Sequence, residues 1–410
     1  MNQIAPDNGP DSPAAPNDSD TESGKPFGAR ARADFLIESG VTYLNHGAFG
    51  ATSRPVMASA QAWRERIEGQ PSRFMKAELQ PLLRQTAQAL GGYVGADGND
   101  IVFLDNASTA INAVLRSLVL FPGDEVLTTN LTYGAVMRTL EFVCDRAESR
   151  LVVESIDYPI QSAEQIIDTL EAAITPRTRL LVIDHITSKS AVILPVAEIA
   201  EVFGDRGIPV LVDGAHAPGM LELDIASLGV SWYTGNCHKW MGTARGAAFL
   251  WTEPARQARV RPTTISHFVA DGYLPAFDWP GTKDFTPYLT VPDAISFRAG
   301  YGEGRIADYC SALAWDSAEK LAGHLDTEIG TPPELTGFMA SVALPASFGR
   351  AKQPIADALR TQIRDRHNLE VDIQAFDGRM WMRLSTYIYN ELSDIDRVID
   401  ALKDAKASDL

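Results

Sequence analysis

Two apolar stretches of the chain lead directly into side chains suited to acid–base and carbonyl chemistry. Residues 208–212 end at Asp213, which is followed by the turn Gly-Ala-His-Ala-Pro-Gly, and residues 232–234 lead to Lys239, which lies between a histidine and a tryptophan. In open α/β sheets ligands bind beyond the carboxyl ends of the strands, so both side chains are expected at one site. A partly buried lysine has a lowered pKa and attacks aldehydes. Taken alone, Asp213 is better explained as a turn residue, and Lys239 equally well as a surface lysine.

A third stretch offers a place for a phosphate group. Residues 105–109 read Asp-Asn-Ala-Ser-Thr and stand between an apolar run and a predicted helix. The first turn of a helix has free N–H groups and the positive end of the dipole, which together bind phosphate. An ordinary N-cap by Asn106 or Ser108 explains the stretch equally well. The three stretches together, however, supply what pyridoxal 5′-phosphate (PLP) requires: a lysine for the aldehyde, a carboxylate for the ring nitrogen and a helix end for the phosphate.

The same stretches carry a family resemblance that runs from about residue 40 to 390. The chain resembles the class V aminotransferase-like group of fold-type I PLP enzymes. Within that group it is most similar to the branch of isopenicillin N epimerase-like and cysteine desulfhydrase-like enzymes. The matching stretches are YLNHGAFG (43–50), FLDNASTAINAV (103–114), LTYGAV (131–136), IDHITSKSAVILPV (183–196), VDGAHAPGMLELD (212–224), YTGNCHKW (233–240), FDWPGTKDFTPYLTVPDAI (277–295) and RLSTYIYN (383–390).

The resemblance implies a role for each residue around the cofactor. Lys239 is expected to be the Schiff-base lysine and the acid–base group at Cα, and Asp213 to pair with the pyridinium. His216 is expected near the phenolic oxygen, and Tyr133 is expected to stack on the ring, a contact that suits an aromatic face. The remaining cofactor-binding positions, mostly around the phosphate, are Ala107, Ser108, Thr109, Ser188, Asn236, His238 and Thr282. Ser188 stands where many relatives carry asparagine.

The substrate side follows from the same resemblance. Arg383 is expected to grip the α-carboxylate of the substrate, because a planar guanidinium binds a carboxylate through two hydrogen bonds. An ordinary surface ion pair is the alternative for this arginine. Asn45 and His46 are expected to line the substrate side, and His46 is a candidate for the second catalytic base. Thr282 is expected to reach the phosphate of a neighbouring subunit, which implies a homodimer with shared sites.

An alternation of short apolar strands with helices is the arrangement that would position these residues. Strand-like runs lie at 101–104, 125–128, 151–154, 180–183, 209–212, 232–234 and 247–250, and helical patterns at 107–120, 135–147, 163–173 and 196–203. This order predicts an α/β fold with a mostly parallel central sheet flanked by helices. After about residue 290 the pattern changes to a smaller α+β domain, with a helix at 306–325, a strand at 381–385 and a helix at 393–405.

The predicted organisation has four parts. They are a disordered tail (1–30), an N-terminal arm that packs with the small domain (31–60), the large PLP-binding domain (61–290) and the small C-terminal domain (291–410). The tail prediction rests on a composition rich in Pro, Asp, Ser and Asn, which leaves little to bury.

Composition narrows the range of partners. The 410 residues carry a formal net charge of -17, which disfavours nucleic acid and anionic membranes as partners. No apolar run approaches the roughly 20 residues that span a bilayer, and we expect a cytoplasmic protein. The three cysteines are scattered and fit no metal site, and none lies between Ser341 and Met382, where related desulfurases carry the catalytic cysteine. A persulfide-forming desulfurase is therefore disfavoured.

Three reactions share the predicted first step, the removal of the Cα proton from an amino-acid substrate. The sequence favours an epimerase or racemase of the isopenicillin N epimerase type. The alternatives are a β-eliminating C–S lyase acting on a cysteine-derived substrate and, less favoured, a transaminase. A non-catalytic PLP-binding regulator is disfavoured, because the lysine, aspartate and arginine set is complete.

Overall fold

The computed structural model describes residues 24–406, so most of the predicted tail lies outside the described part. Phe27 and Gly28, also assigned to the tail, are packed. The ring of Phe27 stacks on Tyr309 with centroids 4.5 Å apart, and the N–H of Gly28 donates to the carbonyl of Ile388 at 2.8 Å. The tail prediction is therefore wrong for these residues, because aromatic contacts with distant parts of the chain outweigh the polar local composition.

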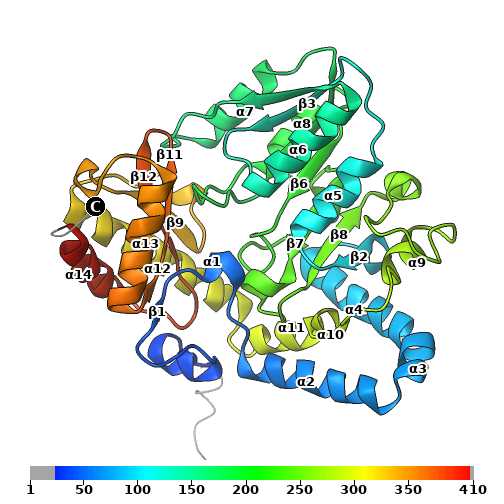
Figure 1. Cartoon of the computed structure of the whole chain (residues 1–410), viewed down its shortest axis with the longest axis horizontal. Coiled ribbons are helices and arrows are strands. Elements are labelled where there is room, and N and C mark those ends of the chain that lie inside the picture. The colour runs from blue at the N-terminus through cyan, green and yellow to red at the C-terminus, as the bar shows by residue number, and fades with distance from the viewer. Residues whose placement is uncertain (1–23, 407–410) are drawn as a thin grey trace, which may run out of the picture.

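A seven-stranded sheet forms the centre of the larger part of the molecule (Figure 1). Its order is β2-β8-β7-β6-β5-β3-β4, and only β8 runs antiparallel to its neighbours. This confirms the predicted α/β fold with a mostly parallel sheet. The strands are β2 (Ile101–Leu104), β3 (Glu125–Thr129), β4 (Arg150–Glu154), β5 (Thr178–Asp184), β6 (Val210–Asp213), β7 (Trp232–Asn236) and β8 (Ala248–Thr252).

Both faces of this sheet are covered, which explains why its strands are apolar at successive positions. Side chains alternate between the two faces: Leu181 and Ile183 belong to the core with α4, α7 and α8, whereas Val182 belongs to the core with α5 and α6. The flanking helices are α4 (Leu79–Val94), α5 (Ala107–Ser117), α6 (Gly134–Ala147), α7 (Ala163–Ala172) and α8 (Val196–Gly204). A further helix, α2 (Arg54–Gly69), lies away from the strands and packs on the helices at 286–289 and 291–299. The sequence did not predict α2 and α4.

A second, smaller unit follows α9 (Tyr273–Asp278), α10 (Thr286–Leu289) and α11 (Val291–Ala299), and lies beside the large sheet in Figure 1. Its antiparallel sheet has the order β11-β12-β9 and shares a core with three helices. A two-residue strand of the N-terminal segment, β1, pairs with β10 of this unit. The elements are β1 (Thr42–Tyr43), α12 (Glu303–Leu325), β9 (Met339–Ala343), α13 (Gln353–His367), β10 (Leu369–Glu370), β11 (Asp372–Phe376), β12 (Arg379–Ser385) and α14 (Asp394–Lys406).

The loops beyond β6 and β7 pack backbone against backbone. Gly219 has φ of 88°, and a Cβ atom there would lie 2.6 Å from the carbonyl carbon of Trp240. Only glycine satisfies both the left-handed conformation and the close approach. The loop that follows Asp213 is thereby held against the loop that carries Lys239.

Replacing Gly219 by alanine is expected to lower the free energy of unfolding by about 2–4 kcal/mol, because strain and overlap add. The matched control is Gly207→Ala, which has φ of 69° but no atom within 4 Å of the added Cβ, and is expected to cost only about 1 kcal/mol of strain. Denaturant unfolding of both variants measures the difference. Equal losses would contradict the close approach.

Candidate active site

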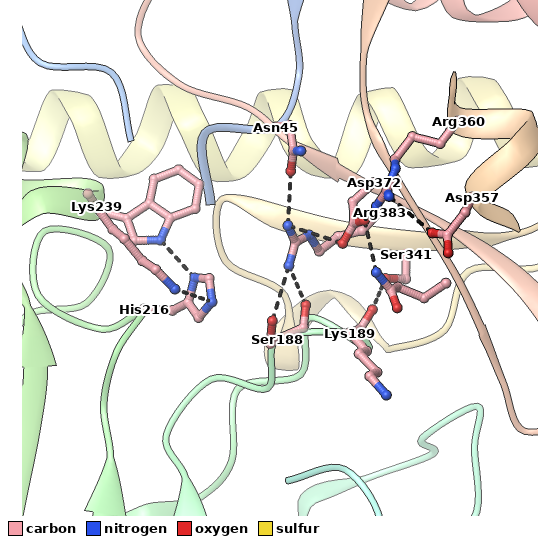
Figure 2. A network of polar contacts seen from close by, with 12 residues as sticks. Asn45, Ser188, Lys189, His216, Lys239, Ser341, Asp357, Arg360, Asp372 and Arg383 are labelled. Carbon is pink, nitrogen blue, oxygen red and sulfur yellow. Dashed lines mark hydrogen bonds and ion pairs between the residues drawn. The ribbon is translucent and has the colours of Figure 1, made fainter. Parts of the chain in front are cut away.

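Lys239 lies in a single π-helical turn, Cys237–Met241, that follows β7 directly. Its Nζ is 3.0 Å from Nε2 of His216 (Figure 2). The indole Nε1 of Trp240 donates to Nδ1 of the same histidine at 3.3 Å. An indole N–H can only donate, so Nδ1 must be the acceptor and the imidazole proton lies on Nε2. His216 then donates to Lys239, which requires the lysine to be a neutral amine.

The surroundings favour this neutral state. Burial lowers the pKa of Lys239 to about 8, with Asp213 opposing the shift and Arg383 adding to it. Burial, followed by the charge of Lys239, also holds the pKa of His216 well below its ordinary value. The pair is therefore a neutral imidazole beside an amine that loses its proton near neutral pH.

Two buried carboxyl groups stand at the ends of adjacent strands. Asp213 ends β6 and accepts a hydrogen bond from the N–H of Ala215 at 3.0 Å, while Asp184 ends β5 and is its partner in the strand register. Burial raises the pKa of both groups, and repulsion from Asp213 raises that of Asp184 further. Sequence reasoning missed Asp184, although it ends an apolar strand run just as Asp213 does.

The first turn of α5 is the predicted phosphate site, and two of its three N–H groups already have partners. The N–H of Ala107 donates to the side-chain oxygen of Asn236 at 2.9 Å, and the N–H of Thr109 donates to that of Asn106 at 2.8 Å. Within the described residues, the N–H of Ser108 has no partner. The turn therefore presents Ser108 as the free backbone donor, and Asn236 acts by holding Ala107.

Three other predicted cofactor residues, His238, Tyr133 and Thr282, lie outside the first turn of α5 and differ in their contacts and exposure. The Nδ1 of His238 is bonded to the carbonyl oxygen of Ala247 at 2.7 Å. Tyr133 precedes α6 and its side chain is 43% exposed, so its ring is free to contact a ligand. Thr282 is exposed on the loop between α9 and α10. Within the described chain it makes no hydrogen bond to the other predicted site residues.

Arg383, in the middle strand of the small sheet, points across to the large unit (Figure 2). Its Nη1 donates to the carbonyl oxygen of Ser188, and its Nη2 donates to the side-chain oxygen of Asn45 at 3.0 Å. The carboxylate of Asp372 lies 3.4 Å from Nη2, and the buried Nε has no partner in the described chain. The guanidinium is therefore a buried cation with one donor uncommitted.

The loop at Ser188 thus supports Arg383. The hydroxyl of Ser188 lies 3.5 Å from the same Nη1. The neighbouring Lys189 is anchored by its carbonyl, which accepts from Ser341 at 3.1 Å, and its side chain points away from Arg383 (Figure 2). The resemblance implies a cofactor contact for Ser188, and in the structure both its carbonyl and hydroxyl oxygens lie against Arg383.

His46 is fully buried, and both of its ring nitrogens are engaged. Nε2 lies 3.1 Å from the carbonyl oxygen of Lys239, to which it must donate, so Nδ1 accepts from the hydroxyl of Tyr389 at 2.7 Å. The ring stacks on Tyr387 with centroids 3.9 Å apart, and burial lowers the pKa of His46 to about 3. This geometry argues against the predicted role as second catalytic base. His46 instead holds the backbone of Lys239.

Comparison with known proteins agrees with this arrangement. The family model described as aminotransferase class-V matches residues 42–273. The chain belongs to the class V aminotransferase family. Within this family it is 32% identical to isopenicillin N epimerase of Amycolatopsis lactamdurans, over 92% of this chain and 98% of that protein. It is 31% identical to putative L-cysteine desulfhydrase 1 of Oryza sativa subsp. japonica, over 91% and 85%.

Two solved structures share the fold of this chain. A variant of C-DES with glycine covalently linked to the PLP cofactor has a TM-score of 0.77 at 20% identity, covering 91% of this chain and 99% of that one. The apo cysteine desulfurase from Thermococcus onnurineus NA1 has a TM-score of 0.75 at 17% identity, covering 93% and 98%. The predicted fold-type I architecture is confirmed, and the chain is a PLP-dependent class V enzyme.

The residues present fit this cofactor. Burial lowers the pKa of the Lys239 amine to about 8, the buried carboxyl group of Asp213 forms no ion pair within the described residues, and α5 presents the free N–H of Ser108. When bound, PLP supplies an electron-withdrawing ring that makes the Cα proton of an attached amino acid acidic. Asp213 is the group suited to hold a proton on the ring nitrogen, because a buried carboxylate is stabilised by an adjacent cation.

The rate at which the apo protein captures added PLP is expected to rise with pH around a midpoint near 8, because only the neutral amine of Lys239 reacts. Visible absorbance follows the capture, and Lys239→Ala should abolish it.

Trp240→Phe removes the donor that fixes the His216 tautomer. His216 can then accept from a charged lysine, and the midpoint should rise by about one unit.

Trp381→Phe is the matched control, since Trp381 is equally buried and its Nε1 has no partner in the described chain. A wild-type midpoint near the ordinary lysine value of 10.5, or an equal shift in both tryptophan variants, would refute the assignment.

Proposed function

We propose that this enzyme removes the Cα proton of an amino-acid substrate and returns it on the opposite face, as an epimerase of the isopenicillin N epimerase type would. The observation that carries the proposal is the 3.0 Å contact between Nζ of Lys239 and Nε2 of His216, at a lysine whose pKa burial lowers to about 8. A base for a Cα proton must be unprotonated at working pH and needs a pKa near that pH. The 32% identity to an epimerase over nearly its whole length supports the choice of reaction.

Arg383 binds the α-carboxylate in this proposal. Its Nε is a buried donor with no partner in the described chain, and such a donor is costly to leave unsatisfied. A carboxylate that takes this donor is fixed in position relative to Lys239. Asn45 and Asp372 hold the guanidinium through Nη2.

A β-eliminating C–S lyase on a cysteine-derived substrate is the second candidate. The engaged ring nitrogens of His46 favour it, because elimination needs only one base whereas epimerisation needs a proton donor on the second face. The three cysteines are buried, and burial raises the pKa of each thiol. A persulfide-forming cysteine is therefore not part of this proposal.

We further propose a homodimer in which Thr282 reaches the phosphate of the other subunit. Phe49 is 67% exposed and directly precedes Gly50, whose Cβ position lies 3.1 Å from Cα of Lys239. In the proposed dimer the other subunit covers Phe49, at the surface beside the loop that carries Lys239. Among the described helices, none combines the length and apolar character needed to cross a bilayer.

Incubation of the PLP-loaded enzyme in deuterated water with a panel of amino acids tests the reaction. Deuterium at Cα with loss of optical purity supports epimerisation. Pyruvate with released sulfide, sulfinate or thiol overturns it in favour of elimination, and a keto acid that forms only with a second amino acid overturns it in favour of transamination. Absence of exchange with every substrate would refute Cα deprotonation itself.

Arg383→Lys is expected to raise KM for the amino-acid substrate by about 10- to 100-fold, because a lysine cannot offer the Nε donor while also keeping the planar contacts to Ser188 and Asn45. Steady-state kinetics measure the change. Arg360→Lys is the matched control: Arg360 bonds Asp372 at 3.3 Å but does not contact Arg383, and KM should change less than about threefold. Similar KM values for both variants would contradict carboxylate binding by Arg383.

A further inference from the structure

Arg298 is a buried arginine that the proposed chemistry does not use. It lies near the carboxyl end of α11, and only 1% of it is exposed. Its charge is balanced by Glu303, the first residue of α12, to which both Nε and Nη2 donate. Nε also lies 3.1 Å from the hydroxyl of Tyr93. Every nitrogen of the guanidinium is therefore bonded, as a buried cation requires.

The other bonds of Arg298 go to the two loops that carry the reacting pair. Nη1 donates to the carbonyl oxygen of Trp240 at 2.7 Å, and Nη2 donates to the carbonyl oxygen of Gly219 at 2.9 Å. Trp240 directly follows Lys239, and Gly219 is three residues after His216. One rigid, planar group thus joins the lysine loop to the histidine loop.

The small unit is tied to the same point. Nη1 of Arg298 also lies 3.0 Å from the hydroxyl of Tyr387, which itself donates to the carbonyl oxygen of Trp240 at 3.2 Å. The ring of Tyr387 stacks on His46, and His46 donates to the carbonyl oxygen of Lys239. The carbonyls of residues 239 and 240 are therefore both fixed, one by the histidine and one by the arginine.

This arrangement controls the contact between Lys239 and His216. The 3.0 Å separation of their nitrogens depends on how the two loops sit against each other, and the loops meet where a Cβ on Gly219 would overlap Trp240. A buried ion pair contributes little net stability compared with apolar residues of equal volume, so stability alone does not account for an arginine here. Its five donors in a fixed plane suit the holding of two carbonyls at a set distance.

We propose that Arg298 is a positioning residue that holds Lys239 in hydrogen-bonding distance of His216 and so keeps the amine neutral and correctly placed. This rests on Lys239 as the residue that captures PLP, and not on which reaction follows. Without the arginine the two loops separate, His216 no longer donates to the amine, and Lys239 returns toward the ordinary protonation of a lysine.

The test compares Arg298→Met and Arg298→Lys with the unaltered enzyme. In Arg298→Met the pH midpoint of PLP capture should rise by about one unit. With a substrate identified by the deuterium panel, kcat should fall about 10- to 100-fold. KM should stay within about threefold, because Arg383 is untouched. Arg298→Lys keeps the charge and one donor direction, so its midpoint and its kcat should lie between those of Arg298→Met and the unaltered enzyme. This variant also tests the proposal if Arg298→Met does not fold.

Arg84 supplies the matched control. It is also a largely buried arginine that pairs with a carboxylate, Asp278 at 2.7 Å, and bonds a backbone carbonyl, that of Ile101 at 2.9 Å, at the amino end of β2. Arg84→Met should lower the melting temperature as much as Arg298→Met does, without moving the midpoint. An unchanged midpoint in Arg298→Met, or an equal shift in Arg84→Met, would overturn the proposal. A wild-type midpoint near 10.5 would instead remove the assignment of Lys239 itself.

Discussion

The hydrogen bond from the indole of Trp240 to His216 is the constraint on which the active site depends. An indole can only donate, so the bond fixes the imidazole tautomer, and the tautomer fixes Lys239 as an acceptor. Burial alone would lower the pKa of the lysine without orienting its lone pair. The adjacent tryptophan orients it indirectly, because it fixes the tautomer of the histidine that donates to the amine. The fold therefore has to bring two loops from neighbouring strands into direct backbone contact. The glycine at position 219 permits this approach, because a Cβ atom there would overlap Trp240.

The site is assembled from both units of the chain. The large sheet contributes the amine, the carboxyls and the helix end, because the carboxyl ends of its parallel strands meet along one edge. The small unit contributes Arg383, and the N-terminal segment contributes Asn45 and His46. Short strands and hydrogen bonds join these parts. The distances between the side chains of the candidate site therefore depend on how the two units are placed relative to each other. The pairing of β1 with β10 fixes the segment that precedes Asn45.

The sequence predicted the sheet well, because buried parallel strands are apolar on both faces and the ends of such runs are recognisable. It also singled out Lys239 and Asp213, because each follows an apolar run, and Arg383 through the family resemblance; the structure places the side chains of Lys239 and Arg383 on the two sides of the region between the units. It did not predict α2 and α4, whose surfaces mix polar and apolar residues.

Sequence reasoning also did not show how side chains pair across long separations in the chain. The side-chain oxygen of Asn236 accepts from the N–H of Ala107, and the hydroxyl of Tyr389 donates to Nδ1 of His46. Ser188 faces Arg383, and nothing local marks Arg298 as a link between loops. A residue type tells which bonds are possible, whereas only the folded chain decides which of them are made.

The contacts of Arg383 have a consequence for how a substrate enters. Its Nη1 and Nη2 bind Ser188 and Asn45, which belong to the large unit and the N-terminal segment. In the proposed binding mode the α-carboxylate takes Nε, the donor that these bonds leave uncommitted. Binding would then add a contact to the guanidinium without breaking the bonds that join the parts of the protein. The same side chain would both hold the two units together and receive the amino acid, so the units would not have to separate when the site fills.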